Sequence, residues 1–470
     1  MKKTILFVAL AVAIVIGCTT EVLDTSYESV LSEALTKGDH PMALNAYVGN
    51  GMMQTRSTLE AESSGNTDRN TVVNKDESRM DGVNMSSYSL ISRSAGVFAY
   101  YSGTAQVDNV TYTDNFYNTS SSSYSYTTND RLSSDEYYES DVISKYLNNA
   151  QLYYSNSDWK TKLLSGGGAD WTDAQVYWPT LTNTNSSGSG DEYMTFFAYY
   201  PHVNTYSNEY GKYGEKNNLF VETAGELGYP MLDYTVATAI DNYPSLDLMV
   251  AKPVVNQKIQ DYSKVDFEFK HLLAAVSVNL QYKEDNTSSS SSSSSPYIFF
   301  TRASMQGVSS SGEVSEDSQF RKRGVFSMAK GQWIHRNDFE PLDLLAYSWL
   351  TQTDKFNLEV GKYYPLFDDG KPSTGNSSLT VDDASLSRPG GDKFMFIIPN
   401  DKQEKLKVNL GYTIISDGFS ENVDLSKEID LQFKPGYIYQ INLVIDKKKL
   451  EFNVEVNDWT YDSSDNPHNI

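Results

Sequence analysis

Short segments in which apolar and polar residues alternate recur along the chain, and they constrain its fold more than any other feature. The clearest is VDFEFKH at 265–271, which puts Phe267 and Phe269 on one side of an extended chain. The same period of two recurs at 42–48 and at 450–456, and stretches rich in Ser, Asn and Gly separate such segments. This pattern predicts antiparallel β-sandwiches with few helices.

Composition and length point to two such domains. Tyrosine occurs 34 times and aromatic residues make up 13% of the chain, which favours strands. At 470 residues the chain is too long for one sandwich. We therefore expect an N-terminal domain at 41–255 and a C-terminal domain at 256–470, with the strand at 265–280 in the second core. The residues of that strand expected to face inward are Phe267, Phe269 and Leu273. Further strands are expected at 88–91, 96–101, 150–154, 176–179, 194–201, 394–399 and 437–445.

Other segments lack strand character. Residues 18–40 form a predicted tether that contains a short amphipathic helix at 27–35, where apolar residues recur at helical spacing. Residues 57–87 are polar and predict a long loop. The Ser-, Tyr- and Asn-rich stretch at 111–140 predicts a mobile surface excursion. The serine run at 288–295 has no side chain able to bury apolar surface and predicts a flexible loop.

The N-terminus has the organisation of an export signal. Lys2 and Lys3 precede an apolar run at 4–16 that is only about 20 Å long as a helix, too short for a bilayer core of about 30 Å. Residues 1–17 are therefore predicted to be a signal peptide. The sequence VIGC that ends at Cys18 resembles the bacterial lipobox, which implies that this cysteine is acylated, for example with palmitate. The alternative is an ordinary signal peptide followed by a chance cysteine.

Charge and cysteine usage limit the partners. The formal net charge is -23, and loss of Lys2 and Lys3 with the signal peptide makes it -25. Such a chain repels nucleic acid and anionic lipid headgroups, so neither is expected as a partner. Cys18 is the only cysteine, and its acylation leaves no thiol for a disulfide or a metal site. The lipid, not the protein surface, is expected to hold the protein to a membrane, because each buried methylene contributes about 0.8 kcal/mol.

No pattern in the sequence predicts catalysis. The five histidines are scattered, and His271, at the end of a strand, is predicted to be packed rather than to bind a metal. Phosphate-binding and nucleophile-elbow motifs are absent. The carboxylates at 135–141 lie in a polar stretch and predict a solvated acidic face, and those at 368–369 lack the other oxygen ligands of a Ca²⁺ loop. We therefore expect neither an enzyme nor a cofactor or metal site.

Several segments taken together resemble the fimbrillin family of outer-membrane lipoproteins from Bacteroidales, the subunits of fimbriae. These segments follow the family's order from the lipobox to the C-terminus. They are VIGC at 15–18, TR at 55–56, VFAYY at 97–101, YWP at 177–179, FFAYYP at 196–201, FEFKHLLA at 267–274, GYIY at 436–439 and VNDW at 456–459.

The resemblance implies an all-β chain of two tandem transthyretin-like antiparallel β-sandwich domains, assembled by strand exchange. In such pilins an arginine-directed protease removes an N-terminal strand, and a strand from another subunit fills the exposed groove. Arg56 occupies the family's cleavage position, although a solvated loop arginine is equally compatible with the sequence. The C-terminal strand at 450–456 is suited to be a donor, and it is also suited to stay in its own sandwich. The candidate donor or groove residues are Met42, Leu44, Ala46, Val48, Leu450, Phe452, Val454 and Val456.

The expected function is that of a structural or adhesive subunit of a cell-surface fimbria. Its expected partners are other fimbrial subunits, the outer membrane through the lipid, and a host or bacterial surface ligand. The alternative is a glycan-binding outer-membrane lipoprotein that uses exposed Tyr and Trp residues as stacking platforms, an interpretation that the Tyr-rich loops at 97–154 fit. A groove under the strand at 42–48 favours the pilin, whereas a flat row of exposed aromatic residues favours the glycan binder. An exported hydrolase is a poor third interpretation, because no catalytic constellation supports it.

Overall fold

The computed structural model describes eighteen stretches of the chain. These are residues 37–48, 71–75, 83–84, 94–114, 116–123, 144–155, 158–164, 171–180, 190–203, 219–222, 229–236, 247–283, 297–335, 339–351, 355–367, 395–416, 419–446 and 449–458. Cys18, Arg56, the helix expected at 27–35 and the serine run at 288–295 lie outside the described residues.

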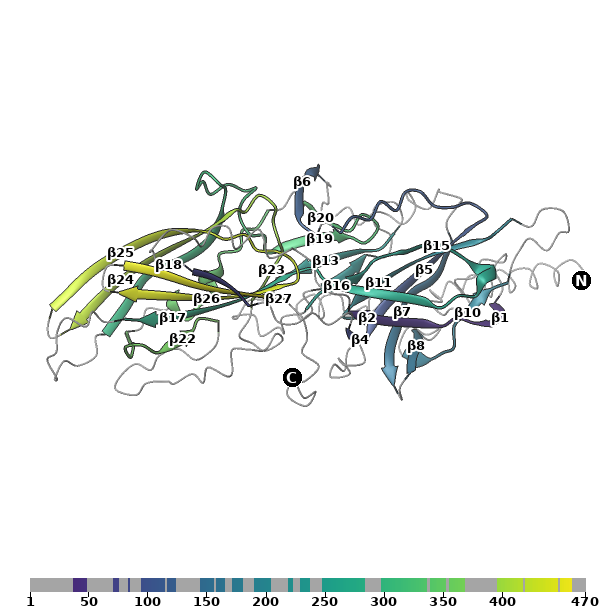
Figure 1. Ribbon diagram of the computed structural model, residues 1–470, viewed down its shortest axis with the longest axis horizontal. Coiled ribbons are helices and arrows are strands. Elements are labelled where there is room, and N and C mark those ends of the chain that lie inside the picture. Colours follow the sequence, from purple (N-terminus) through teal and green to yellow (C-terminus); the bar gives the residue numbers. More distant parts are fainter. Residues whose placement is uncertain are drawn as a thin grey trace, which may run out of the picture.

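A ten-stranded N-terminal sheet dominates the first half of the chain, on the right in Figure 1. Its order is β4-β2-β16-β14-β11-β5-β7-β8-β9, with β15 paired beside β11. A separate pair, β1 (Lys37–Pro41) and β10 (Tyr177–Pro179), lies next to it. The strands of the sheet are β2 (Leu44–Val48), β4 (Val83–Asn84), β5 (Ala95–Gly103), β7 (Ser144–Ser155), β8 (Asp158–Leu164), β9 (Trp171–Asp173), β11 (Tyr193–Tyr200), β14 (Met249–Ala251), β15 (Val254–Lys258) and β16 (Val265–His271).

Two further sheets form a sandwich from the second half of the chain together with β3, on the left in Figure 1. One has the order β22-β17-β26-β27-β3, with β23 paired to β17, and the other has the order β21-β18-β24-β25. The strands of the first are β3 (Thr71–Lys75), β17 (Ala274–Tyr282), β22 (Tyr363–Pro365), β23 (Met395–Ile397), β26 (Tyr437–Asp446) and β27 (Lys449–Asp458). The strands of the second are β18 (Tyr297–Val308), β21 (Phe356–Asn357), β24 (Lys405–Ser416) and β25 (Phe419–Asp430).

A five-stranded central sheet joins the two halves and takes strands from both. Its order is β12-β13-β19-β20-β6. The strands are β6 (Asn118–Ser123), β12 (Leu219–Glu222), β13 (Met231–Thr235), β19 (Arg323–Ser327) and β20 (Gln332–His335). Only short 3-10 turns accompany the strands in the described residues, namely Ile259–Asp261, Leu344–Tyr347 and Trp349–Thr351. The predicted all-β architecture is confirmed, and no helix among the described residues could span a membrane.

Burial on both faces explains why two central strands read as continuous apolar runs. One face of β5 and β11 belongs to the N-terminal core, which contains Val97 and Phe196. The other face packs with central-sheet residues in the larger core, which contains Phe98 and Phe197. A strand covered on both sides has no solvent face to supply polar residues, so its alternation disappears.

One prediction about the cores is wrong. Phe267 and Phe269 are fully buried, but they belong to the N-terminal core rather than to the second core, because β16 pairs with β14 and β2. Leu273 does pack in the larger core. The chain therefore passes from one sheet to the other between β16 and β17, and the division at residue 255 stays a prediction.

A second prediction is wrong for the part of 111–140 that the structure describes. Phe116 is buried and packs edge-on against Phe326, and Tyr112 packs beside it. Strand β6 then pairs in parallel with β20. Two aromatic side chains that pack in the core hold this stretch against the central sheet, a contact that its polar composition did not indicate.

Candidate functional site: the N-terminal segment

The N-terminal segment, residues 37–48, comprises β1 and β2. β1 pairs antiparallel with β10 from Lys37 opposite Pro179 to Pro41 opposite Tyr177. A Cβ at position 38 would overlap the backbone carbonyl of Trp178, so Gly38 allows the two backbones to approach. The first half of the segment is thus fitted closely to β10.

β2 lies between two strands but is joined by a hairpin to neither. It pairs in parallel with β16, from Leu44 opposite Val265 to Val48 opposite Phe269, and on its other side two residues pair with β4. The N–H of Val265 donates to the carbonyl of Ala43 at 2.9 Å, and the N–H of Met42 donates to the carbonyl of Val176 at 2.9 Å. Because the pairing is parallel, no tight turn links β2 to β16. Removing β2 would leave β16 in place and open one of its edges.

The inward side chains of the segment complete the N-terminal core. Met42, Leu44 and Ala46 have 3%, 7% and 0% of their surface exposed and pack in the cluster that contains Trp178 and Phe267. Burying a side chain such as Met or Leu stabilises by about 1.5–3 kcal/mol. The strand predicted at 42–48 is thus found as β2, extended by the inward Met42, and the groove beneath it is apolar.

The outward side of the segment is polar. The amide of Asn45 donates to the carboxylate of Asp266 at 2.7 Å, and His40 stacks on Tyr262 with ring centroids 3.8 Å apart. Burial, with the charges of Glu268 and Asp266, raises the pKa of Tyr47, which keeps the phenol neutral. These polar contacts hold the outward side of the segment, whereas its apolar side chains are buried in the N-terminal core.

The candidate C-terminal strand lies in a different sheet. β27 pairs antiparallel with β26 and in parallel with β3, and Leu450, Phe452 and Val454 are buried in the larger core. Val456 pairs with Tyr439 through the backbone. The structure therefore does not bring the two sets of candidate strand residues together.

β1 and its pairing with β10 were missed by sequence reasoning. KGDHP at 37–41 shows no alternation and falls in the stretch at 18–40 expected to be a tether. The only signal in the sequence was the isolated aromatic strand YWP at 177–179, which needs a partner strand. Backbone pairing carries this contact, so side-chain periodicity does not reveal it.

Polar clusters elsewhere have structural explanations. Nδ1 of His271 lies 2.8 Å from Oδ1 of Asp247, and the ring is 4% exposed, so the prediction of a packed histidine is confirmed. Within the described stretches no group of three His, Cys, Asp or Glu residues could hold a metal ion.

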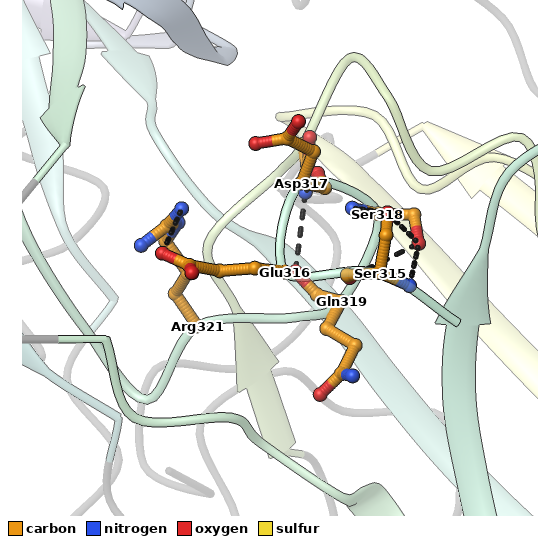
Figure 2. Close-up of polar contacts among 7 residues, drawn as sticks. Ser315, Glu316, Asp317, Ser318, Gln319 and Arg321 are labelled. Carbon is orange, nitrogen blue, oxygen red and sulfur yellow. Dashed lines mark hydrogen bonds and ion pairs between the residues drawn. The ribbon is translucent and has the colours of Figure 1, made fainter. Parts of the chain in front are cut away.

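A second polar cluster caps the turn before β19. Figure 2 shows Arg321 reaching toward Glu316, with Nη2 and Oε1 3.9 Å apart. In the same turn the N–H of Ser315 donates to Oγ of Ser318 at 3.1 Å. The guanidinium also lies over the ring of Phe339, and burial lowers its pKa. The cluster fixes the turn, and it holds no nucleophile paired with a base.

Comparisons with known proteins show which family and which solved structures this chain resembles. A model of the fimbrillin-like family matches residues 92–459. A solved fimbrial protein from Bacteroides vulgatus is 16% identical, with 90% of this chain and 100% of that chain covered and a TM-score of 0.45. Candidate cell adhesion proteins from Bacteroides uniformis and Bacteroides ovatus are 13% and 11% identical, covering 90% and 91% of this chain and 100% of theirs, with TM-scores of 0.29 and 0.32. No curated protein is significantly similar. Since the family model matches most of its length, the chain belongs to the fimbrillin-like family.

Proposed function

We propose that this chain is a structural or adhesive subunit of a cell-surface fimbria. It is exported as a lipoprotein precursor, is anchored in the outer membrane through Cys18, and joins other subunits by strand exchange after cleavage at Arg56. Membership of the fimbrillin-like family supports the fimbrial role. As a building block it acts by binding other subunits, not by catalysis.

The N-terminal segment is the observation that carries the proposal. It fills an apolar groove of the N-terminal sheet, yet it is joined to that groove only by β-ladders and side-chain contacts. Arg56 lies eight positions after Val48. One cut there therefore separates the whole segment, together with Cys18, from the rest of the chain.

Strand exchange follows from the physics of the vacated groove. Loss of the segment leaves the edge of β16 without its backbone partners and exposes the apolar surface that Met42, Leu44 and Ala46 cover. An alternating strand from another subunit restores both contributions at once. A strand that buries three apolar side chains and pairs along β16 would form a lasting joint.

The glycan-binding alternative needs a flat row of exposed aromatic side chains. Within the described residues the exposed large aromatic side chains are Tyr262, in the turn between β15 and β16, and Phe419, on β25 of another sheet. In the described part of 97–154, Phe98, Tyr100 and Tyr146 are buried in the cores. These observations favour the fimbrial subunit.

Substitution at the cleavage position tests the proposal. We expect Arg56→Ala to prevent trimming and polymer formation while export and folding stay normal, because the segment keeps its place in the groove. N-terminal sequencing of the surface protein and native-gel ladders after trypsin treatment measure the two effects. The matched control is Arg69→Ala, which removes another arginine that precedes β3. Normal polymers from the Arg56→Ala protein would mean that another bond is cut or that the subunit is an anchor that retains its lipid.

A further inference from the structure

The groove that holds the N-terminal segment contains a buried hydrogen-bond donor, the indole N–H of Trp178. Trp178 is 0% exposed, and its indole Nε1 has no hydrogen-bond partner among the residues that the structure describes. By contrast, Nε1 of the buried Trp349 donates to the carbonyl of Pro365 at 2.7 Å. A buried N–H without an acceptor destabilises the state that contains it.

The N-terminal segment enters the core next to this donor. The N–H of Met42 bonds to the carbonyl of Val176, two positions before Trp178. In an extended chain, residues two apart point to the same side, and both Val176 and Trp178 pack with Met42 in the N-terminal core. Met42 is therefore an inward side chain of the segment that bonds through its backbone two positions from Trp178 and shares the N-terminal core with that indole.

The segment itself cannot satisfy the donor with its inward side chains. Met42, Leu44 and Ala46 carry no oxygen or nitrogen, and the thioether sulfur of methionine is a weak acceptor. A second indole repeats the situation. Trp159, on β8, packs against the same core, its Nε1 is buried without a partner in the described part of the chain, and β8 contacts β2.

We propose that Trp178, with Trp159, selects the strand that replaces the N-terminal segment. The preferred occupant is a strand of another fimbrial subunit that carries a hydroxyl or amide side chain at the inward position held by Met42 in the precursor. That oxygen accepts the indole N–H, so the exchanged state gains a hydrogen bond that the precursor lacks. The inward residues Leu450, Phe452 and Val454 of this chain's own β27 offer no such acceptor. The proposal rests on the strand exchange proposed above.

A double-mutant cycle on the intact chain tests the contact without any cleavage. Met42→Gln keeps the side-chain length and adds an amide oxygen, and Trp178→Phe removes the donor while keeping an aromatic ring. Urea unfolding measures the factor by which Met42→Gln changes the folding equilibrium constant in each background. We expect this factor to be about tenfold more favourable with Trp178 than with Trp178→Phe, which corresponds to about 1.4 kcal/mol. A coupling below about twofold would overturn the proposal.

The chain offers a matched control for this cycle. Trp333 is also fully buried with an unpartnered Nε1 in the described structure, but it packs in the larger core away from the segment. Trp333→Phe should show no coupling to Met42→Gln. If Trp178→Phe fails to fold, deuterium exchange of the Trp178 indole N–H replaces the cycle. Slower exchange in the Met42→Gln protein supports the contact, and unchanged exchange contradicts it.

Capture of labelled peptides tests selection directly. The full chain is treated with trypsin in the presence of a peptide of residues 37–48, either native or with Met42→Gln. We expect the Gln peptide to be captured five- to tenfold more, and the difference to vanish in Trp178→Phe protein. Equal capture of both peptides refutes selection and leaves strand exchange intact. Capture of neither peptide refutes strand exchange itself, and with it the selection of a partner, whatever the result of the cycle.

Discussion

A small network of buried side chains lies at the end of the N-terminal sheet, where β5, β7 and β11 pair. Asn149 is buried, and its backbone adopts the left-handed conformation with φ at 55°. Its Oδ1 accepts a hydrogen bond from the hydroxyl of Tyr199 at 2.7 Å, and its amide donates to the carbonyl of Val203 at 2.8 Å. A Cβ at position 96 would overlap both Tyr199 and Asn149, so Gly96 leaves room for them. His202 lies beside this network and packs edge-on to Trp171, with ring centroids 4.6 Å apart.

The histidine makes stability depend on pH. Burial lowers the pKa of His202 to about 4, although a hydrogen bond to the backbone of Asn149 acts in the opposite direction. In the unfolded chain a histidine has a pKa of about 6.5. The folded state therefore holds the ring neutral, and stability present above pH 6.5 is lost as the pH falls toward 4. At pH 5 the loss is about 2 kcal/mol.

We expect His202→Gln to remove this acid-dependent loss. Urea unfolding at pH 7.5 and at pH 5 measures it, with the exposed His40 changed to Gln as the control. A wild-type protein equally stable at both pH values would contradict the buried neutral state. So would an equal effect of the two substitutions.

At the scale of elements, the N-terminal segment contains one strand that the sequence predicts, β2, and one that it does not predict, β1. β2 alternates between core and rim, whereas β1 depends on its close approach to β10 through Gly38. A parallel strand at β16 and a short antiparallel strand at β10 hold the segment at two points without a hairpin. The contacts that hold the segment in its groove thus come from strands that do not follow it directly in the chain.

Gly38→Ala should loosen the segment without changing its apolar face. The added methyl group meets backbone rather than a movable side chain, and overpacking of this kind costs about 1–3 kcal/mol. We expect faster hydrogen exchange at the Met42 N–H, which bonds to Val176. Gly190→Ala is the control, because a Cβ there meets only the side chain of Thr104. Unchanged exchange at Met42 would show that β1 does not help to hold the segment.

At the scale of the whole molecule, the central sheet connects the two halves, because strands from both halves pair within it. β13 precedes residue 255 and pairs along its length with β19, which follows it. The guanidinium of Arg323 reaches both carboxylate oxygens of Asp233, at 2.9 and 2.6 Å, and the Asp233 side chain is 5% exposed. The ion pair of Lys270 with Asp114, at 3.1 Å, joins β16 of the N-terminal sheet to the stretch that precedes β6 of the central sheet.

Breaking the Arg323–Asp233 pair should weaken this connection. Arg323→Met leaves a buried carboxylate without its charged partner, and such a loss costs about 3–5 kcal/mol in buried pairs, less here because Arg323 is 37% exposed. We expect a lower melting temperature and a thermal transition that broadens or splits in calorimetry. Arg302→Met, at an exposed pair with Asp424, should change little. Equal effects of the two substitutions would mean that the central sheet does not couple the halves.

The sequence by itself determined the fold class and those strands whose apolar residues alternate or run together. Alternation identified β2, β16 and β27 and the faces that they bury, because side chains on an extended chain take turns on its two sides whatever the strand pairs with. It did not indicate which sheet a strand joins. Phe267 and Phe269 face inward as predicted but in the other core, and Phe116 is buried within a stretch whose composition is polar. Which sheet a strand joins is decided by backbone hydrogen bonds to residues far away in the chain, and those bonds have no sequence period. For the same reason only the tertiary structure placed β1 on β10 and brought Met42 and Trp178 into one core.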